Sequence, residues 1–139
     1  MIYSGINVSQ NEFNFPSRTL QFVKNTPKHL ELLHQIKSDI VVLDLEDSVL
    51  PENKTKMVEM FSKALSKGHC SSKQVVIRPC GLDSDETSMQ IERLSHPDLF
   101  GFMLPKIESP ACLHQYEEMI NKAERANHLQ PGNQYMFKN

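Results

Sequence analysis

The chain has 139 residues, of which 39% are hydrophobic and 23% charged, and its formal net charge is −2. This length allows one domain with a hydrophobic core and is short for two, and the composition is that of an ordinary soluble globular protein. No cluster of lysine and arginine indicates nucleic-acid binding. The longest apolar run, residues 40–43, is far below the roughly 20 residues that a membrane span needs. We therefore expect neither nucleic acid nor a membrane as a partner.

Three cysteines, Cys70, Cys80 and Cys112, are odd in number and form no CxxC pair. This usage argues against a disulfide framework and a Cys-type zinc site, and it favours a reducing, intracellular setting. Residues 1–16 contain no lysine or arginine, so they resemble neither a secretory signal nor an arginine-rich transit peptide. We interpret them as a loose N-terminal arm and expect a cytoplasmic protein or one of unknown compartment.

Two apolar runs and two helix-like segments follow the arm. The first run, 19–23, precedes Thr26-Pro27, which is typical of an N-cap and a first-turn proline. The second run, 39–45, is rich in β-branched residues and precedes a helix expected over about 51–67, with Gly68 as its stop.

Two more runs complete the pattern. The third, 74–77, ends at Arg78 and precedes a helical stretch over 84–94. The fourth, 101–104, is followed by Ser109-Pro110, which opens another helix. After Asn127 the helical pattern fades, and we assign 128–139 to a tail in which residues 134–137 stand where a fifth strand should begin.

Four alternations of strand and helix predict an α/β fold with parallel strands joined by helical crossovers. Nearly continuous apolar runs suit a sheet that is covered on both faces. The pattern permits a doubly wound sheet or a piece of a (β/α)₈ barrel. A complete barrel needs about 250 residues, so the chain supplies roughly half of one, a truncated half-barrel of about four β/α units. The barrel domain is expected over residues 17–127.

Charged residues gather where the predicted strands end. Asp44, Glu46 and Asp47 follow the second strand, Arg78 ends the third, and Lys106 follows the fourth. The carboxyl ends of parallel strands share one face, where ligands bind. Three acids and two cations at one end of the sheet suit an anionic substrate, with a divalent metal held by carboxylates and water.

A structural interpretation stands beside this functional one. Acidic residues before a helix can simply favour the helix N-terminus. Arg78 can equally be an ion-pair partner for Glu46 or Asp47. Spacing alone leaves both interpretations open.

Four blocks in the sequence resemble one known family. They are Arg18-Thr19, the run IVVLDLEDSV over 40–49 with Pro51 and Lys54 after it, Val76-Ile77-Arg78, and the run MLPKIESP over 103–110. Together they are similar to the citrate lyase β-subunit-like (HpcH/HpaI aldolase) family over about residues 17–120. The first and fourth blocks most resemble its citramalyl-CoA lyase branch, which is found in animal mitochondria.

The resemblance implies a (β/α)₈ barrel that binds Mg²⁺ and a CoA thioester. Such enzymes cleave a 3-hydroxy-acyl-CoA, such as citramalyl-CoA or malyl-CoA, by a retro-aldol or retro-Claisen step, in which the metal stabilises the developing enolate. The resemblance assigns substrate binding to Arg78, whose planar fork suits a carboxylate or carbonyl oxygen, and also to Arg18 and Lys106. Glu46 and Asp47 correspond to catalytic acids that touch the metal only through water.

The chain departs from the family pattern at several positions. Lys24-Asn25 replaces a Pro-Gly turn, Cys80 replaces an asparagine, and Val58 replaces an arginine. The family's two direct metal ligands, a glutamate on the fifth strand and an aspartate on the sixth, have no counterpart in the 139 residues. We therefore expect impaired activity in this chain. The alternatives are a non-catalytic relic or interaction module, and a partial product of a longer gene.

An open parallel sheet also predicts self-association. Unpaired edges are expected at residues 19–23 and 101–104, and unpaired strand edges recruit other strands. The side chains of Val41, Leu43, Val76 and Met103 are expected to face the barrel interior, where half of their surroundings would be missing.

Overall fold

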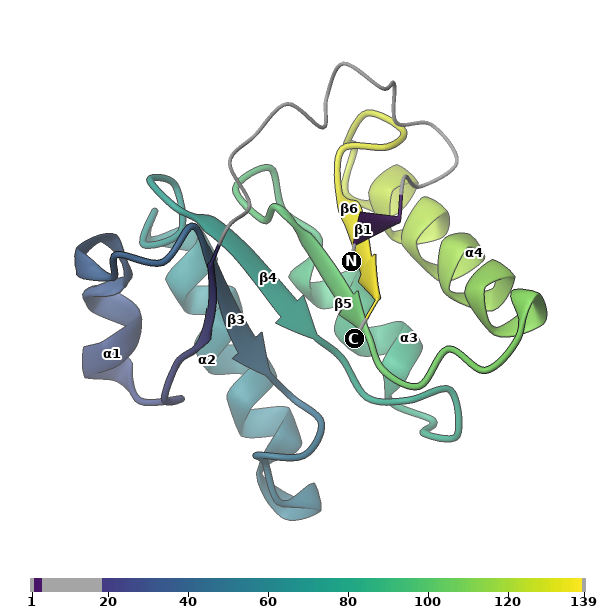
Figure 1. Cartoon of the computed structure of the whole chain (residues 1–139), viewed down its shortest axis with the longest axis horizontal. Helices are drawn as coiled ribbons and strands as arrows, with labels where there is room; N and C mark the ends of the chain where they lie inside the picture. Colours follow the sequence, from purple (N-terminus) through teal and green to yellow (C-terminus); the bar gives the residue numbers. More distant parts are fainter. Residues whose placement is uncertain (1, 4–18, 139) are drawn as a thin grey trace.

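In the computed structural model, which describes residues 2–3 and 19–138, one six-stranded sheet forms the centre of the molecule (Figure 1). The strand order is β1-β6-β5-β4-β3-β2, and β2 to β6 are all parallel. Only β1 is antiparallel, and it pairs with β6. The strands are β1 (Ile2–Tyr3), β2 (Leu20–Phe22), β3 (Ile40–Asp44), β4 (Gln74–Arg78), β5 (Gly101–Leu104) and β6 (Tyr135–Lys138).

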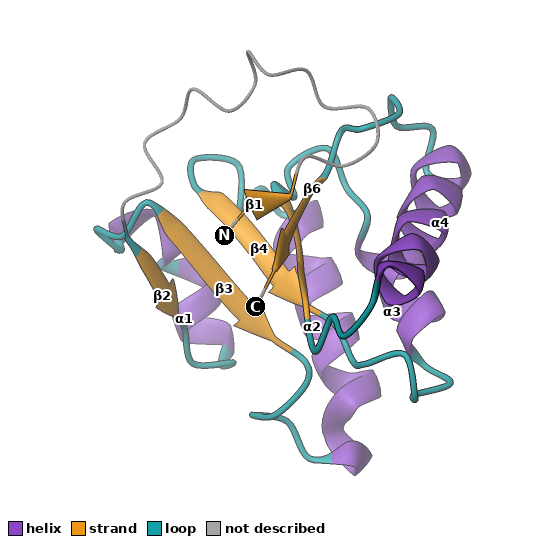
Figure 2. Cartoon of the chain, turned by 45° about the vertical axis from the view of Figure 1, so that its right-hand side comes forward, coloured by secondary structure: helices purple, strands orange, loops and turns teal. Residues whose placement is uncertain are grey.

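The helices lie together on one face of the sheet (Figure 2). Each parallel strand from β2 to β5 is followed by a helical crossover to the next strand, as the alternating pattern predicts. The helical elements are α1 (Pro27–Glu31), η2 (Leu33–Gln35), η3 (Pro51–Asn53), α2 (Lys54–Ser66), α3 (Thr87–Leu94) and α4 (Pro110–Ala126). No helix in the described ranges is long and apolar enough to cross a membrane.

Two helix starts confirm the capping signals in the sequence. The Thr26 side chain accepts a hydrogen bond from the backbone N–H of His29 (3.2 Å), and the Ser109 side chain accepts one from Cys112 (3.3 Å). In each case a proline occupies the first helical position. The helix expected over 51–67 is divided into the 3₁₀ turn η3 and the helix α2.

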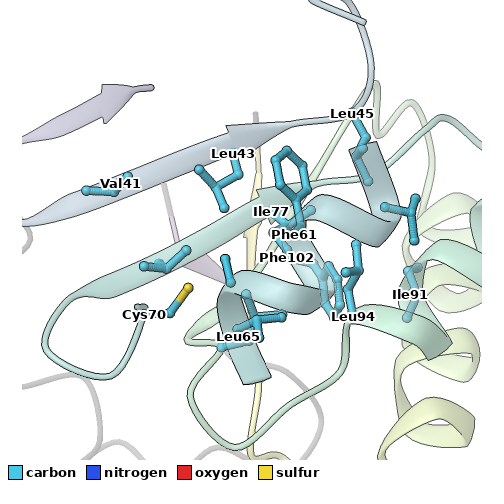
Figure 3. Packing of buried hydrophobic residues seen from close by; sticks show 14 of the residues in the cluster. Val41, Leu43, Leu45, Phe61, Leu65, Cys70, Ile77, Ile91, Leu94 and Phe102 are labelled. Carbon is cyan, nitrogen blue, oxygen red and sulfur yellow. The ribbon is translucent and has the colours of Figure 1, made fainter. Parts of the chain in front are cut away.

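The main hydrophobic core lies between the sheet and the helices (Figure 3). Alternate strand residues point towards the helices because side chains in a strand alternate between its two faces. Fully burying one such side chain contributes about 1.5–3 kcal/mol. The largest members of this core are the aromatic residues Phe61, Phe102 and Tyr116, and they pack among leucines and isoleucines such as Leu43, Ile77 and Leu94.

A second, smaller hydrophobic cluster lies on the opposite face of the sheet. It contains Ile40, Val42, Val76, Met103 and Phe137. The prediction that Val41 and Leu43 share this face with Val76 and Met103 is wrong. Val42 lies opposite Val76 in the parallel register, so the odd-numbered neighbours in β3 point to the helices instead.

The segment assigned to a tail contains β6, a fifth parallel strand. Met136 and Phe137 are both buried, and β6 pairs with β5 along its whole length. The turn before β6 is held by the buried Glu124 carboxylate, which accepts hydrogen bonds from the backbone N–H groups of Gly132 (3.2 Å) and Gln134 (3.0 Å). The expected open edge at 101–104 is therefore wrong, because β6 occupies it.

Part of the N-terminal arm also belongs to the sheet. Residues Ile2–Tyr3 form β1, which pairs with Met136 and Phe137. The remaining arm residues, 1 and 4–16, lie outside the described residues, as does Arg18.

The close pairing of β5 and β6 can be tested with Gly101→Ala. An added Cβ would meet the backbone oxygen of Tyr135 and a ring carbon of Phe137, and neither can move without shifting β6. We expect the free energy of unfolding to fall by about 1–3 kcal/mol in urea titrations, as for other overpacked sites. Gly81→Ala is the matched control, since its nearest neighbour is the flexible, exposed Asp83 side chain. Wild-type stability in Gly101→Ala would contradict this pairing.

Candidate functional site

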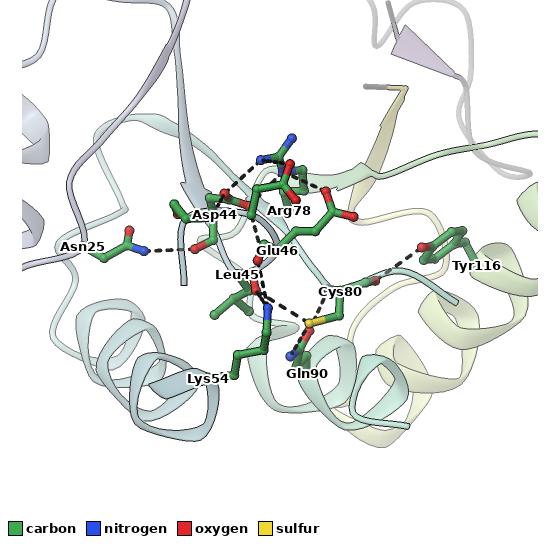
Figure 4. A network of polar contacts seen from close by, with 11 residues as sticks. Asn25, Asp44, Leu45, Glu46, Lys54, Arg78, Cys80, Gln90 and Tyr116 are labelled. Atoms are coloured by element: carbon green, nitrogen blue, oxygen red, sulfur yellow. Dashed lines mark hydrogen bonds and ion pairs between the residues drawn. The ribbon is translucent and has the colours of Figure 1, made fainter. Parts of the chain in front are cut away.

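The carboxyl ends of β3, β4 and β5 carry the charged residues singled out in the sequence. β3 ends at Asp44 and leads into Glu46 and Asp47, and β4 ends at Arg78. Asp44 lies opposite Arg78 in the register of the two strands. Figure 4 shows the side chains of Asp44, Glu46 and Arg78 close together at this end of the sheet.

A buried ion pair forms the centre of the site. Arg78 Nε lies 2.8 Å from Asp44 Oδ1, and Arg78 Nη2 lies 2.8 Å from Asp44 Oδ2. The Asp44 carboxylate also accepts the backbone N–H groups of Glu46 (2.9 Å) and Ser48 (3.0 Å). Asp44 is only 3% exposed. A bidentate, buried pair of this kind fixes the orientation of both side chains.

The hydrogen bonds keep Asp44 charged despite its burial. Burial alone would raise the pKa of Asp44, but the hydrogen bonds from Arg78 and from the backbone of Glu46 and Ser48 outweigh it and hold the pKa at about 2. The guanidinium of Arg78 is stabilised in turn, and its pKa is raised by the hydrogen bond to Asp44. Both groups are therefore charged at neutral pH.

The close partner of Arg78 is Asp44 rather than the acids that sequence reasoning named. Glu46 Oε1 lies 3.7 Å from Nε, and Asp47 Oδ2 lies 3.8 Å from Nη2, so both acids are secondary partners. The ring of Phe22 lies 5.0 Å from the guanidinium carbon, in a cation–π contact. Among the described residues, Nη1 of Arg78 makes no hydrogen bond, so this nitrogen can still donate to a bound oxygen.

Glu46 and Asp47 have different environments. The Glu46 side chain is largely buried, and its pKa is raised by burial and by the charge of Asp47, against the opposing charge of Arg78. The Asp47 side chain is 78% exposed. Glu46 is consequently the acid better suited to exchanging a proton with a substrate, whereas Asp47 faces solvent.

Two side chains that sequence reasoning did not assign to the site hold its backbone. Lys54 Nζ donates to the carbonyl oxygens of Leu45 (2.6 Å) and Glu46 (2.8 Å). Asn25 Nδ2 donates to the carbonyl oxygen of Asp44 (2.9 Å), and its buried Oδ1 has no hydrogen-bond partner among the described residues. The sequence does contain a signal that could have identified Lys54: it lies at the start of a helix, where a cation is unfavourable unless another contact holds it.

Cys80 is held in place by several hydrogen bonds. Its backbone N–H donates to Gln90 Oε1 (2.9 Å), and Gln90 Nε2 lies 3.1 Å from its sulfur. The Tyr116 hydroxyl donates to the Cys80 carbonyl oxygen (3.3 Å). These contacts join the loop after β4 to α3 and α4.

A cavity of about 690 Å³ opens at Glu46 and Asp47, the two secondary partners of Arg78. Lys106 also lines this cavity, which brings three of the predicted site residues together. Lys106 has a φ of 46°, a left-handed conformation that is uncommon outside glycine and is frequent at functional sites. Arg78 reaches Glu46 and Asp47 but does not line this cavity.

Comparison with known proteins shows the family of the chain. Residues 18–137 match the family described as HpcH/HpaI aldolase/citrate lyase. The chain belongs to this family. A citrate lyase subunit beta from Leuconostoc mesenteroides subsp. cremoris is 29% identical over 109 residues, which are 78% of this chain and 36% of that protein. The chain thus spans about a third of the length of this relative.

Two solved structures of a Haloferax volcanii malate synthase share the fold. Its lead(II) complex superposes with a TM-score of 0.74 at 19% identity and covers 87% of this chain and 40% of the synthase. Its magnesium/glyoxylate complex gives a TM-score of 0.75 at 18% identity, with 87% and 41% covered. At this identity the likeness establishes the fold alone. The described sheet therefore corresponds to part of a barrel of the family type.

The ion pair makes the stability of the chain sensitive to acid. Because the folded-state pKa of Asp44 is lowered to about 2 from 3.8, its contribution is fully present above pH 3.8 and is lost as the pH falls through about 2. Asp44→Asn should reduce the free energy of unfolding at pH 7 by about 3–5 kcal/mol, since Arg78 is left buried without its partner. As the pH falls below 3.8, the free energy of unfolding should also decrease less steeply in Asp44→Asn than in the wild-type chain.

The measurement is urea unfolding of both proteins from neutral pH into the acid range. Asp85→Asn, which neutralises an exposed aspartate, is the control for the change in net charge. An Asp44→Asn variant as stable as the Asp85→Asn control would show that the pair does not hold the site.

Proposed function

We propose that this site belongs to a carbon–carbon lyase that cleaves a 3-hydroxy-acyl-CoA such as citramalyl-CoA or malyl-CoA. The observation that carries the proposal is the fixed Arg78 guanidinium with Glu46 Oε1 at 3.7 Å, beside an open cavity that Glu46 lines. Family membership and the similarity to a citrate lyase subunit beta support the reaction class. CoA thioesters and the cleavage step itself are parts of the proposal.

The reaction requires charge stabilisation and proton transfer. A base removes the proton of the 3-hydroxyl group, its oxygen becomes a carbonyl, and the adjacent carbon–carbon bond breaks. The electron pair of that bond passes to the acyl-CoA fragment as an enolate, which a proton then quenches. Glu46, with its raised pKa, is the proposed proton acceptor and donor. The free Nη1 of Arg78 is proposed to bind a substrate carboxylate or carbonyl oxygen.

Two further residues are proposed to bind substrate. Lys106 lines the cavity, where its cation can attract an anionic substrate group. Arg18 keeps the same proposed role from the family resemblance, although it lies outside the described residues.

The magnesium ion implied by the resemblance fits this part of the chain only through water. Glu46 and Asp47 flank the cavity, but no group of three metal-ligating side chains exists within residues 2–3 and 19–138. When bound, Mg²⁺ would supply Lewis-acid stabilisation of the enolate. Its direct ligands would have to come from outside the described residues.

Magnesium affinity should accordingly be low. Mg²⁺ usually binds one or two carboxylates directly, together with substrate oxygens. Glu46 and Asp47 are proposed to reach the ion only through water, and among the described residues they belong to no group of three metal-ligating side chains. Isothermal titration should give a dissociation constant in the millimolar range or no measurable heat. Micromolar affinity would mean that Asp44, Glu46 or Asp47 coordinates the ion directly.

The second candidate is a non-catalytic interaction module that retains the fold. It is favoured by the position of the Arg78 fork, whose Nε and Nη2 are already occupied by Asp44. It is favoured also by the lack of a three-ligand metal cluster among the described residues.

Substrate binding and turnover separate the two candidates. With Mg²⁺ present, we expect the chain to bind citramalyl-CoA or malyl-CoA and to cleave it slowly. Glu46→Gln should leave binding nearly unchanged and lower the rate about 100-fold, because it removes the proton-transfer group. Arg78→Lys should weaken binding about tenfold, because it removes the planar fork. Chromatography of the CoA products measures the rate, and titration calorimetry measures binding.

The possible results have distinct meanings. Arg78-dependent binding without cleavage would favour the interaction module. A chain that binds neither thioester would contradict the proposed function. Asp85→Asn again serves as the charge control, since Asp85 lies on the surface and does not line the cavity.

A further inference from the structure

A groove runs between two helices on the helical side of the sheet. α1 and α2 pack against each other there (Figure 1), and a cavity of about 360 Å³ opens between them. α1 contributes Pro27, Leu30 and Glu31, and the rest of the lining comes from α2 and from His69 in the turn after it. The helices of a (β/α)₈ barrel form its outer ring. Both walls of this groove are therefore present whether or not further strands complete the barrel.

The floor of the groove is apolar. Leu30 and Ala64 line it and are buried members of the main hydrophobic core, and Met60 lines it and packs against that core. Because a close-packed core holds these side chains, the floor keeps its shape without a ligand. Sites for small organic ligands typically have volumes of about 300–1,000 Å³ and mainly apolar walls with a few polar groups. The groove fits this description.

Three lysines of α2 line the same groove. Lys56, Lys63 and Lys67 are seven and four residues apart, so they follow one side of the helix over about 16 Å. All three are exposed, and among the described residues none of their ammonium groups makes a hydrogen bond or an ion pair. Lysines four residues apart on a helix repel each other. An anion bound beside Lys63 and Lys67 relieves this repulsion.

The acids in the groove do not cancel its positive charge. The lining contains the three lysines and two glutamates, Glu31 and Glu59. Glu59 is paired with Arg93 of α3, so its charge is already compensated from outside the groove. The groove is therefore net positive at neutral pH even when His69 is uncharged. A positive rim above an apolar floor indicates a ligand that has both a negative charge and an apolar part.

We propose that the groove between α1 and α2 binds a small organic anion that carries a carboxylate or phosphate group on an apolar body. The apolar body lies against Leu30, Met60 and Ala64, and the anionic group reaches the ammonium groups of Lys63 and Lys67. A lysine suits either anionic group, because its ammonium group acts as a compact point charge.

The size of the groove favours a small ligand over a protein. The wall that α1 provides has five residues, which extend over only about 7.5 Å. A stable protein–protein interface buries about 800 Å² on each partner, which is far more than such a short wall offers. A ligand of a few tens of atoms needs no larger surface than the cavity provides.

Isothermal titration with four simple probes tests this ligand class. Octyl phosphate and octanoate combine a negative charge with an apolar chain, and both should bind below their micelle concentrations. Inorganic phosphate should bind at least about tenfold more weakly than octyl phosphate, because two buried methylene groups already contribute that factor. Octan-1-ol should bind at least about threefold more weakly, since it leaves the lysines without a partner. Binding of only one of the two anions would support the proposal and identify the anionic group that the groove accepts.

Variants of the rim locate the binding. Lys63→Gln and Lys67→Gln should each weaken the binding of octyl phosphate about threefold or more, since each removes one exposed cation. Lys122→Gln is the matched control, because Lys122 is exposed on α4 and does not line the groove. In ¹H–¹⁵N NMR spectra, the resonances that shift on titration should belong to residues 27–31 and 56–69.

Three results would each overturn the proposal. The first is that neither octyl phosphate nor octanoate binds. The second is that Lys63→Gln and Lys67→Gln bind octyl phosphate as tightly as Lys122→Gln does. The third is that the NMR shifts lie outside α1, α2 and the turn at His69. Circular dichroism verifies that all three variants fold, and exposed lysines on a helix surface can be replaced by glutamine at little cost to the helix.

Discussion

The bidentate pairing of Asp44 with Arg78 is the interaction on which the site depends. It joins the ends of two adjacent strands through residues 34 positions apart in the chain. The same carboxylate accepts the backbone N–H groups of Glu46 and Ser48, so the first turn after β3 is shaped around it. One buried anion thus determines both the direction of the guanidinium and the path of the acidic loop. Removing either partner leaves a buried charge, which is why the pair is costly to break.

The loop around this pair gives two adjacent acids different properties. Lys54 holds the carbonyl oxygens of Leu45 and Glu46 from one side, while Arg78 approaches the Glu46 carboxylate from the other. Glu46 is therefore fixed and largely buried, and its pKa is raised, whereas Asp47 extends into solvent. When two neighbouring acids have different environments, one can transfer protons while the other stays ionised. The distinction arises from the loop geometry and not from the residue types.

Sequence reasoning predicted the parallel strands, the Thr26 and Ser109 caps and the gathering of Glu46, Asp47 and Lys106, because each depends on local pattern or on strand polarity. It placed the start of a fifth strand at residues 134–137 but assigned them to a tail, since a four-residue strand gains its stability from pairing with β5, a contact that no local pattern records. Nor did it predict that Asp44 is the close partner of Arg78. That pairing requires the register of β3 against β4, and a shift by one residue would turn one of the side chains to the other face.

Two of the departures from the family pattern, Asn25 and Cys80, lie near the ion pair and are held by local contacts. Asn25, in place of a glycine, donates its amide to the Asp44 carbonyl oxygen. Cys80, in place of an asparagine, is held by the amide of Gln90 and by the Tyr116 hydroxyl. Both substitutions therefore preserve the positions of the strand ends while changing the groups offered to a ligand. The Asp44–Arg78 pair itself is intact, so these two departures change the cavity linings around the pair and leave the pair as it is.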